Sequence, residues 1–411
     1  MANIVVLAHR VPYPPNKGEK LRTFHQIEEI IRKGHSVLVL APTENDDDVK
    51  NAKKLAKHFD ITVKTAPLIA KPLRLARALL LRQSFSEANF YSNDLLGLFL
   101  LESTNADSVL LTASSLAPYA FALPADQKAQ LLMDFMDVDS DKWMQYSVQS
   151  SAIKKLVYRR EATKVKELER EISERFTRTF VIAETEKKLF QKRVHQTDNI
   201  LVLGNGIDQS LFNPCESKPI DTINFLFSGV MDYKPNIDAI LWFIKNCWSG
   251  IEQEIPNARL IIAGMNPTES IKALSKHNNI EVTGFVDDIK PYFDKSHIFV
   301  APFQIARGVQ NKVLQAMASA IPVISTALGA EGIMCKDKED ILIAKDAKAF
   351  EQLSLTLAKS AKLRSKIGYN GLETINNNYA WESVLLPLTQ TLAIGEPLIS
   401  DDNNHNRLNA K

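Results

Sequence analysis

Cysteine and long apolar runs are both scarce in this chain of 411 residues. The three cysteines are scattered without CxxC or CxxH spacing, which argues against a zinc site and fits a reducing cytoplasm. No apolar run approaches the roughly eighteen residues that a membrane-spanning helix needs. The opening MANIVVLAHRVPYPP has only a short apolar run, which is typical of a first strand and not of a signal peptide. Any membrane contact is therefore expected to be peripheral.

An excess of charge of one sign is also missing. The 50 Lys and Arg residues nearly balance the 48 Asp and Glu residues, and the formal net charge of +2 gives no signature of nucleic-acid binding. No internal repeat with a period of about 20–50 residues is present. The hydrophobic share of 45% and the charged share of 24% are ordinary for a globular enzyme. The length suits two domains, because a single core of this size is unusual.

Short apolar segments alternate with helical patterns in two series. Each series opens with an apolar strand, 3–8 or 224–228, followed by a turn that contains glycine, at Gly18 or Gly229. Continuous apolar strands that alternate with helices predict parallel sheets covered on both faces. We therefore predict an α/β protein of two Rossmann-like domains that face each other across a cleft. The predicted strands are 3–8, 35–40, 61–64, 108–111, 131–137, 180–182, 200–203, 224–228, 258–263, 280–283, 298–302, 323–326 and 340–344.

The stretch 298–326 is the most informative part of the chain. Its pattern predicts a strand, a loop with Arg307 and Gly308, a helix and a second strand. In such a unit the N–H groups at the helix N-terminus stabilise an anion such as a diphosphate. Asn311 and Gln315 share one side of this helix and can bond ribose or sugar hydroxyls, while the Arg307 guanidinium can bind phosphate oxygens. The alternative is a solvated helix face after an ordinary loop.

This stretch resembles the donor-site helix of GT-B glycosyltransferases of family 4, the glycosyl transferases group 1. More narrowly, the chain is similar to sugar transferases of bacterial exopolysaccharide and exosortase (PEP-CTERM) loci. The similarity includes the PP-x-K-G pattern at 14–18, the D-x-x-DVDS-x-KW signature at 134–143 and the N-G-x-D…F-x-P signature at 205–214. One departure concerns two glutamates that the family usually carries eight positions apart, because Arg307 and Gln315 stand there instead.

The resemblance implies a retaining transferase of the hexosyltransferase type. It would move a sugar from a nucleotide diphosphate sugar to a saccharide acceptor, expected to be lipid-linked, without a cofactor or a bound metal. The first domain would bind the acceptor and the second the donor, with the nucleobase at the G-x-V-x-D turn that begins at Gly284. The enzyme would work in the cytoplasm, at the inner face of the membrane. The predicted donor-binding residues are Gly229, Lys234, Gly284, Val286, Asp287, Gly308, Asn311, Lys312 and Gln315.

Carboxylates follow one predicted strand of the first domain. Asp137 and Asp139 lie where ligands bind in open α/β sheets, and either could orient an acceptor hydroxyl or bind a donor-sugar hydroxyl. With Arg307 they form the predicted catalytic set. Asp139 could instead cap the next helix, and the Asp-x-Asp metal motif of the unrelated GT-A fold is a chance match in a chain with two predicted sheets. The predicted acceptor and phosphate loop, for which a basic surface turn is the alternative, comprises Lys17, Gly18, Lys20 and Arg22.

Two helices and the domain limits complete the predictions. The basic, leucine-rich helix 71–82 could lie on an anionic membrane or could be a core helix with a solvated basic stripe. The charged helix 151–173 is predicted to be exposed to solvent. Residues 1–205 would form the first domain, completed by a helix at 381–395, and residues 206–380 the second. The tail 396–411 is expected to be disordered.

Two other functions share this architecture. A GT-B nucleotide-sugar 2-epimerase would consume the donor and need no saccharide partner. A scaffold that binds nucleotide sugars without catalysis is suggested by the absence of the usual glutamates.

Overall fold

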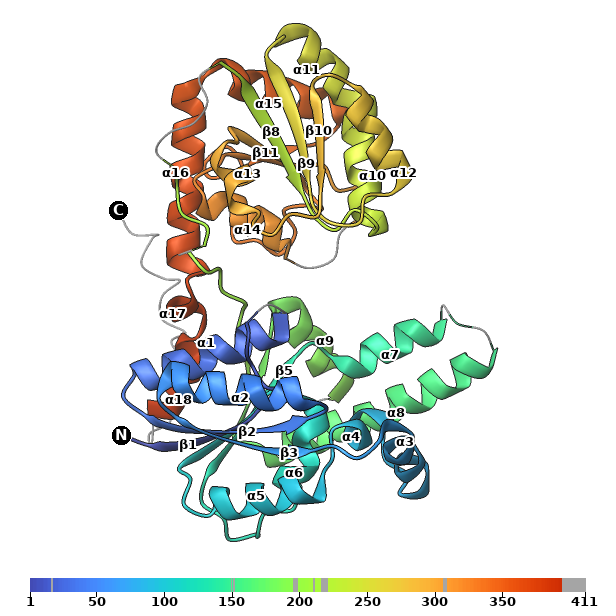
Figure 1. Cartoon of the computed structure of the whole chain (residues 1–411), viewed down its shortest axis with the longest axis vertical. Coiled ribbons are helices and arrows are strands. Elements are labelled where there is room, and N and C mark those ends of the chain that lie inside the picture. Colours follow the sequence, from blue (N-terminus) through green and yellow to red (C-terminus); the bar gives the residue numbers. More distant parts are fainter. Residues whose placement is uncertain are drawn as a thin grey trace, which may run out of the picture. The chain divides into compact units, whose positions relative to one another are not determined.

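The computed structural model describes residues 1–15, 18–148, 150, 152–194, 199–209, 211–215, 221–305 and 309–393 (Figure 1). Lys17, Arg307 and Gly308 lie outside this described part. The chain divides into two compact units. Unit 1 comprises Met1–Asn205 and the described residues from Val384 onward, and unit 2 comprises Gly206–Ser383.

Unit 1 contains a sheet of seven parallel strands in the order β3-β2-β1-β4-β5-β6-β7. The central strand β1 pairs with β2 on one side and with β4 on the other, so that Val5 lies beside both Leu38 and Val109. Strands inside such a sheet are covered on both faces, and β1 and β4 accordingly consist almost wholly of buried residues. The strands are β1 Asn3–Leu7, β2 Ser36–Thr43, β3 Thr62–Pro67, β4 Ser108–Leu111, β5 Gln130–Met136, β6 Arg178–Val181 and β7 Ile200–Val202.

Helices cover both faces of this sheet, with α1 and α2 on one side and α5 and α6 on the other (Figure 1). This arrangement follows from the right-handed crossovers between parallel strands, because the strand order reverses direction at β1. The helices are α1 Gly18–Arg32, α2 Asp46–Phe59, α3 Lys71–Leu80, α4 Phe85–Asn89, α5 Asn93–Ser103, α6 Ala117–Phe121, α7 Asp139–Val148, α8 Ala152–Arg175, α9 Glu184–Val194 and α18 Leu386–Ala393, with a 3₁₀ turn at Ser114–Leu116.

Unit 2 repeats the same topology with six parallel strands in the order β10-β9-β8-β11-β12-β13. Its core is formed by the two buried faces of this sheet and the helices that pack on them. The strands are β8 Ile223–Ser228, β9 Ala258–Ala263, β10 Ile280–Gly284, β11 Ile298–Ala301, β12 Val323–Thr326 and β13 Leu342–Ala344. The helices are α10 Lys234–Phe243, α11 Ser249–Glu254, α12 Glu269–Lys272, α13 Lys290–Asp294, α14 Asn311–Ala318, α15 Ala347–Lys359, α16 Ala361–Asn378 and α17 Trp381–Val384, with a π turn at Ile244–Trp248 and a 3₁₀ turn at Ala273–Lys276.

The prediction of an exposed helix at 151–173 is wrong for one face of α8. Val165, Leu168 and Ile172 are buried, and so are the carboxylates of Glu161 and Glu169. Residues spaced three and four apart share a helix face, and here that face packs on unit 1. The buried carboxylates each bond backbone N–H groups of a neighbouring helix, which is why the unit tolerates them.

The helix α3 does not present the predicted basic stripe to solvent. Arg74 is buried and donates to the carbonyl oxygen of Asn89 and to Glu44. The guanidinium of Arg77 lies over the ring of Tyr91, 4.2 Å from its centroid. The arginines of α3 are therefore used inside unit 1. Across the described residues, no helix combines the length and the apolar character required to cross a membrane.

Candidate functional site

In unit 2, two glycines bring the ends of β8 and β9 close together. The Cβ of any other residue at 264 would lie 1.7 Å from the carbonyl oxygen of Gly229, so the backbones can approach only because Gly264 has no side chain. A Cβ at 229 would lie 2.7 Å from the amide nitrogen of Asn236 and 3.2 Å from Nζ of Lys312. Both positions therefore require glycine, and the turn after β8 leaves its backbone accessible to a ligand.

The ammonium of Lys312 lies beside this turn. Its Nζ donates to Oδ1 of Asn236 over 2.7 Å and is 4.9 Å from the ring centroid of Phe303 and 6.0 Å from that of Phe227. Burial lowers the pKa of Lys312 to about 8. Within the described part of the chain, no carboxylate lies within ion-pair distance of this ammonium. A bound anion would supply the missing counter-charge and stabilise the protonated lysine.

Lys312 belongs to the first turn of α14, and no side chain caps the N-terminus of this helix. Uncapped N–H groups and the helix dipole favour an anion at this end. Asn311 is exposed and Gln315 is half-buried one turn further along. Lys312, Asn311 and the N-terminus of α14 therefore offer one cation, one amide side chain and the positive end of a helix dipole in a single place.

The other predicted donor residues lie on two further turns of unit 2. Lys234 is 79% exposed and forms an ion pair with Asp238 at 2.7 Å, so it is solvated and already has a partner. β10 ends at Gly284 in the left-handed region (φ of 69°), followed by the half-buried Val286 and the exposed Asp287. The roles predicted for Arg307 and Gly308 stay predictions, because both lie outside the described residues.

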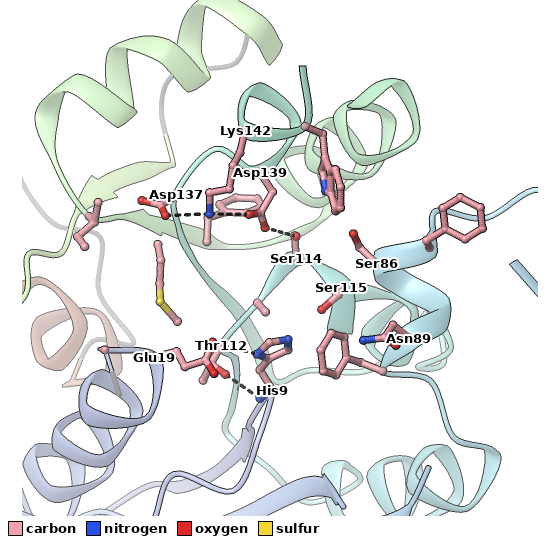
Figure 2. Close-up of a pocket in the computed structure, with 18 of the residues that line it drawn as sticks. His9, Glu19, Ser86, Asn89, Thr112, Ser114, Ser115, Asp137, Asp139 and Lys142 are labelled. Atoms are coloured by element: carbon pink, nitrogen blue, oxygen red, sulfur yellow. Dashed lines mark hydrogen bonds and ion pairs between the residues drawn. The ribbon is translucent and has the colours of Figure 1, made fainter. Parts of the chain in front are cut away.

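In unit 1, the carboxyl ends of β1, β4 and β5 open into a cavity of about 610 Å³ (Figure 2). Asp137 and Asp139 line it, as predicted from their position after a strand. The backbone at Met136 makes this possible, because the pairing of β5 with β6 shifts register there and Met136 has a φ of 60°. A bulge of this kind redirects the side chains that follow it, and a left-handed non-glycine residue stores strain that is common at functional sites.

Lys142 links the two carboxylates. Its Nζ is 3.1 Å from Oδ2 of Asp137 and 3.4 Å from Oδ1 of Asp139, whose Oδ2 accepts a hydrogen bond from Ser114 (Figure 2). Burial raises the pKa of Asp139, although Lys142 opposes the shift. Burial also disfavours the charge of Lys142, but the two carboxylates outweigh it and raise its pKa. An ammonium thus occupies the space between the carboxylates of the Asp-x-Asp sequence.

A buried carboxylate, which sequence reasoning missed, leaves Asp139 available to the cavity. Glu169 of α8 accepts hydrogen bonds from the N–H of Ser140 (2.9 Å) and from its hydroxyl (2.6 Å) at the start of α7. Burial raises the pKa of Glu169 to about 7. Because Glu169 satisfies this N-terminus, Asp139 is not needed as its cap. The structure therefore does not support the alternative in which Asp139 only caps the helix.

His9 and Glu19 are two further cavity residues that sequence reasoning did not select. The His9 ring lies 3.9 Å from the ring of Phe90, centroid to centroid, and its backbone N–H donates to Thr112. Burial and the nearby Arg10 lower the pKa of His9 to about 4, so its ring is neutral at pH 7 and its contact with Glu19 is not an ion pair. His9 directly follows the central strand, and the strand-end rule that selected Asp137 could have found it as well.

The structure gives Arg22 a different role from the predicted one in an acceptor and phosphate loop. Its guanidinium is fully buried and bonds both carboxylate oxygens of Asp134, at 2.5 and 2.9 Å. It also donates to the carbonyl oxygens of Leu203 and Gly204 and to Oδ1 of Asn205. With these bonds Arg22 has no donor left for a ligand, and the correction is that it holds the end of β7 to the sheet.

The remaining residues of that loop are separated. Gly18 lines the cavity of unit 1. Lys20 does not, and its ammonium donates to the carbonyl oxygen of Tyr13 over 3.3 Å. Lys17 lies outside the described residues.

Residues 222–360 match the family model described as Glycosyl transferases group 1. This chain carries a group 1 glycosyltransferase domain. Within this transferase domain lie Gly229, Gly264, Gly284, Lys234 and Lys312, and the cavity of unit 1 lies outside it.

Relatives match over longer parts of the chain. A 44.6 kDa protein in the cps region of Klebsiella pneumoniae is 24% identical over 410 residues, which covers 92% of this chain and 97% of the relative. The capsular polysaccharide biosynthesis glycosyltransferase CapM of Staphylococcus aureus is 26% identical over 234 residues, which covers 51% of this chain and 61% of CapM.

The similarity of structure covers both units of the glycosyltransferase. The crystal structure of Anabaena HepE in complex with UDP and glucose matches 96% of this chain and 100% of HepE, with a TM-score of 0.63 at 12% identity. The fold is therefore GT-B, as predicted, with one Rossmann-like sheet in each unit.

Proposed function

We propose that this protein is a retaining glycosyltransferase that moves a sugar from a nucleotide diphosphate sugar to a saccharide acceptor in the synthesis of a bacterial surface polysaccharide. The match to the group 1 family supports transfer, and the relatives in the cps region and in capsule synthesis support the pathway class. The complex of HepE with UDP and glucose supports a uridine nucleotide as the first donor to test. Retention of configuration and a lipid-linked acceptor follow from the family resemblance.

The observation that carries the proposal is the ammonium of Lys312 next to the Gly229 turn, which bonds a neutral amide and has no carboxylate partner among the described residues. When the bond between the sugar and the diphosphate breaks, negative charge develops on the leaving nucleoside diphosphate. Lys312, the N-terminus of α14 and Arg307 would stabilise that charge, and fixed donors of this kind contribute roughly 3–4 kcal/mol each to catalysis. We expect Lys234 to contribute less, because Asp238 already neutralises it. The turn from Gly284 to Asp287 would receive the nucleobase, and Asn311 and Gln315 would bond its ribose.

The cavity of unit 1 would receive the acceptor. It offers carboxylate, hydroxyl and imidazole groups around a space large enough for a sugar, since ligand pockets commonly measure about 300–1,000 Å³. Asp137 and Asp139 would accept hydrogen bonds from acceptor hydroxyls, including the hydroxyl that attacks the sugar and loses its proton. The presence of this polar cavity in unit 1, apart from the donor residues of unit 2, favours transfer over the 2-epimerase alternative, which needs no saccharide partner.

A thermal-shift screen with UDP-, GDP-, ADP- and TDP-sugars tests the donor assignment. A ligand at about a hundred times its dissociation constant adds about 2.7 kcal/mol to the free energy of unfolding, which a melting curve resolves. We expect one nucleotide class to stabilise the wild type and to lose this effect in Lys312→Met, with Lys234→Met as the matched control. No stabilisation by any class would contradict the proposal.

Transfer itself is then measured with the stabilising donor and a panel of lipid-linked saccharides, with and without EDTA. We expect product that retains the anomeric configuration, and activity that persists with EDTA. Hydrolysis or epimerisation of the donor without an acceptor would favour the epimerase. Binding of the donor without any turnover would favour a non-catalytic scaffold.

A further inference from the structure

Helices α7 and α8 form a hairpin that extends away from the sheet of unit 1 (Figure 1). The described part of this hairpin carries a set of exposed apolar side chains, which we name the hairpin face. Ile153 is 82% exposed, and Val148 and Leu156 are each 72% exposed. The hairpin face consists of Tyr146, Val148, Ile153, Leu156 and Val157.

The hairpin is held together by an aromatic cluster that shares only Tyr146 with the hairpin face. The rings of Trp143, Tyr146 and Tyr158 cluster between the two helices, with centroids 5.5–6.2 Å apart. This aromatic cluster fixes α7 against α8 without using the aliphatic side chains of the hairpin face. Ile153, Leu156 and Val157 follow i, i+3, i+4 spacing, which places them on one side of α8. These side chains are therefore exposed even though the two helices of the hairpin pack against each other.

The segment of the hairpin that joins α7 to α8 carries charge of one sign, whereas the carboxylates of the two helices lie outside it. The sequence from Lys142 to Arg160 contains five basic residues and no carboxylate. Lys142 bonds Asp137 and Asp139 in the cavity, and Arg160 bonds a carbonyl oxygen. The other three basic residues have no carboxylate within ion-pair distance in the described part of the chain. These three residues are Lys154, Lys155 and Arg159.

The hairpin also stands at the acceptor cavity. Trp143 and Tyr146 of α7 line the same cavity as Lys71 and Leu75 of α3. A partner bound to the hairpin face would therefore lie close to the mouth of that cavity. On α3, by contrast, the two arginines are used internally, as described above, and Lys71 is the one basic residue of that helix left exposed.

We propose that the hairpin face docks on an anionic membrane surface. Its aliphatic side chains would enter the boundary between headgroups and acyl chains, and Lys154, Lys155 and Arg159 would contact lipid phosphates. Exposed aliphatic groups flanked by basic residues, with no acidic residue in the same segment, match the chemistry of an anionic lipid surface. A protein partner would not require that carboxylates be absent. Docking needs neither donor nor acceptor. Only its consequence, the delivery of a lipid-linked saccharide to the neighbouring cavity, rests on the proposed function.

Co-sedimentation of the full chain with vesicles tests this proposal. The vesicles contain phosphatidylcholine alone or phosphatidylcholine with phosphatidylglycerol. We expect binding to the anionic vesicles only, weakened by added salt. The charge reversal K154E/K155E should weaken binding about thirtyfold or more, because each basic residue near such a surface contributes about 1 kcal/mol. I153S/L156S should weaken it about tenfold or more, since each buried CH₂ contributes about 0.8 kcal/mol.

Matched controls lie elsewhere on unit 1. Lys53 and Lys54 are adjacent exposed lysines of α2, and Leu101 of α5 is 67% exposed. K53E/K54E and L101S should bind the anionic vesicles as the wild type does. Equal binding by the hairpin variants and these controls would overturn the proposal, as would no binding of the wild type.

A second readout separates lipid from protein as the occupant. If the wild type self-associates in sedimentation velocity and I153S/L156S is monomeric, the hairpin face is an interface between copies, and the proposal is overturned. The stabilisation by nucleotide sugars is measured on the same variants and should be unchanged. Failure of docking and failure of the transferase assignment are thereby distinguished.

Discussion

Each unit holds a cation near the carboxyl ends of its strands, fully buried at Arg22 and half-buried at Lys312, and the two cations differ in what surrounds them. Arg22 of unit 1 bonds both oxygens of Asp134 and three further oxygen atoms, so all its donors are used. Lys312 of unit 2 bonds one neutral amide oxygen, and burial lowers its pKa. A cation whose N–H groups all meet acceptors supports the fold. A cation that has no anionic partner among the described residues can bind an anionic ligand.

Arg22→Met should have the largest effect, and the effect should be on stability. Removal of one partner from a buried ion pair destabilises by about 3–5 kcal/mol, because the Asp134 charge stays buried without its counter-charge. Urea unfolding measures the change. The double variant Arg22→Met/Asp134→Leu should recover part of the loss. An unchanged midpoint for Arg22→Met would show that the pair does not support the fold.

Glu169→Gln extends this contrast to a buried carboxylate that, unlike Asp134, has no ion pair with a guanidinium in the described structure, although Arg193 is near enough to oppose the rise of its pKa. Burial raises the pKa of its carboxyl group to about 7 in the folded protein, above the ordinary value of 4.5 for the unfolded chain, so the folded state binds the proton more tightly. The contribution of this group to stability is complete below about pH 4.5 and is lost as the pH rises through about 7. Summed over this window the loss is about 3 kcal/mol.

Glutamine keeps an oxygen that can accept from Ser140 but cannot ionise. Unfolding free energies are measured from pH 4.5 to pH 8 for both proteins. The wild type should lose stability relative to Glu169→Gln as the pH rises. Parallel curves would contradict the assigned pKa.

Lys312→Met should lower ligand affinity and leave stability almost unchanged, the opposite of the effect expected for Arg22→Met. Stability should change little or increase, because the variant removes a half-buried charge that has no anionic partner among the described residues. Affinity for the nucleoside diphosphate should fall by about thirtyfold, the equivalent of about 2 kcal/mol for a lost charge-assisted hydrogen bond. Calorimetric titration with UDP measures the affinity, and Lys312→Arg should retain most of it. A Lys312→Met variant with lower stability but normal affinity for UDP would show that Lys312, like Arg22, supports the fold.

The pH dependence of donor binding gives the smallest effect. Only the protonated form of Lys312 attracts the diphosphate, so affinity should be constant below about pH 8 and should fall above it. The limiting slope is about tenfold per pH unit. Lys312→Arg should bind with no such fall, because arginine stays protonated. The same decline in Lys312→Arg would assign the titration to another group.

The sheets could be predicted because each strand is a continuous apolar run. All thirteen predicted strands occur, within a few residues of their predicted limits. The helix α5 (Asn93–Ser103) was not predicted, since its apolar residues show no helical period. Asp137 and Asp139 were found by the strand-end rule, which depends only on local sequence.

The roles of Arg22 and Lys312 could not be separated by sequence. Both are basic residues near a glycine turn, and Asp134, which decides the role of Arg22, is 112 positions away. Glu169 was missed for a related reason. Its sequence neighbours alternate in charge, which predicts a solvated residue. Only the packing of α8 against α7 shows that Glu169 caps a helix.

Proton uptake on nucleotide binding reports whether the Lys312 ammonium meets the diphosphate. UDP is titrated into the wild type at about pH 8.5 in buffers of different ionisation enthalpy, because Lys312, with a pKa of about 8, is then largely neutral in the free protein. We expect the wild type to take up most of one proton. Lys312→Arg should still bind UDP and should take up none. Tight binding by the wild type without proton uptake, or equal uptake by Lys312→Met, would show that the Lys312 ammonium does not meet the diphosphate.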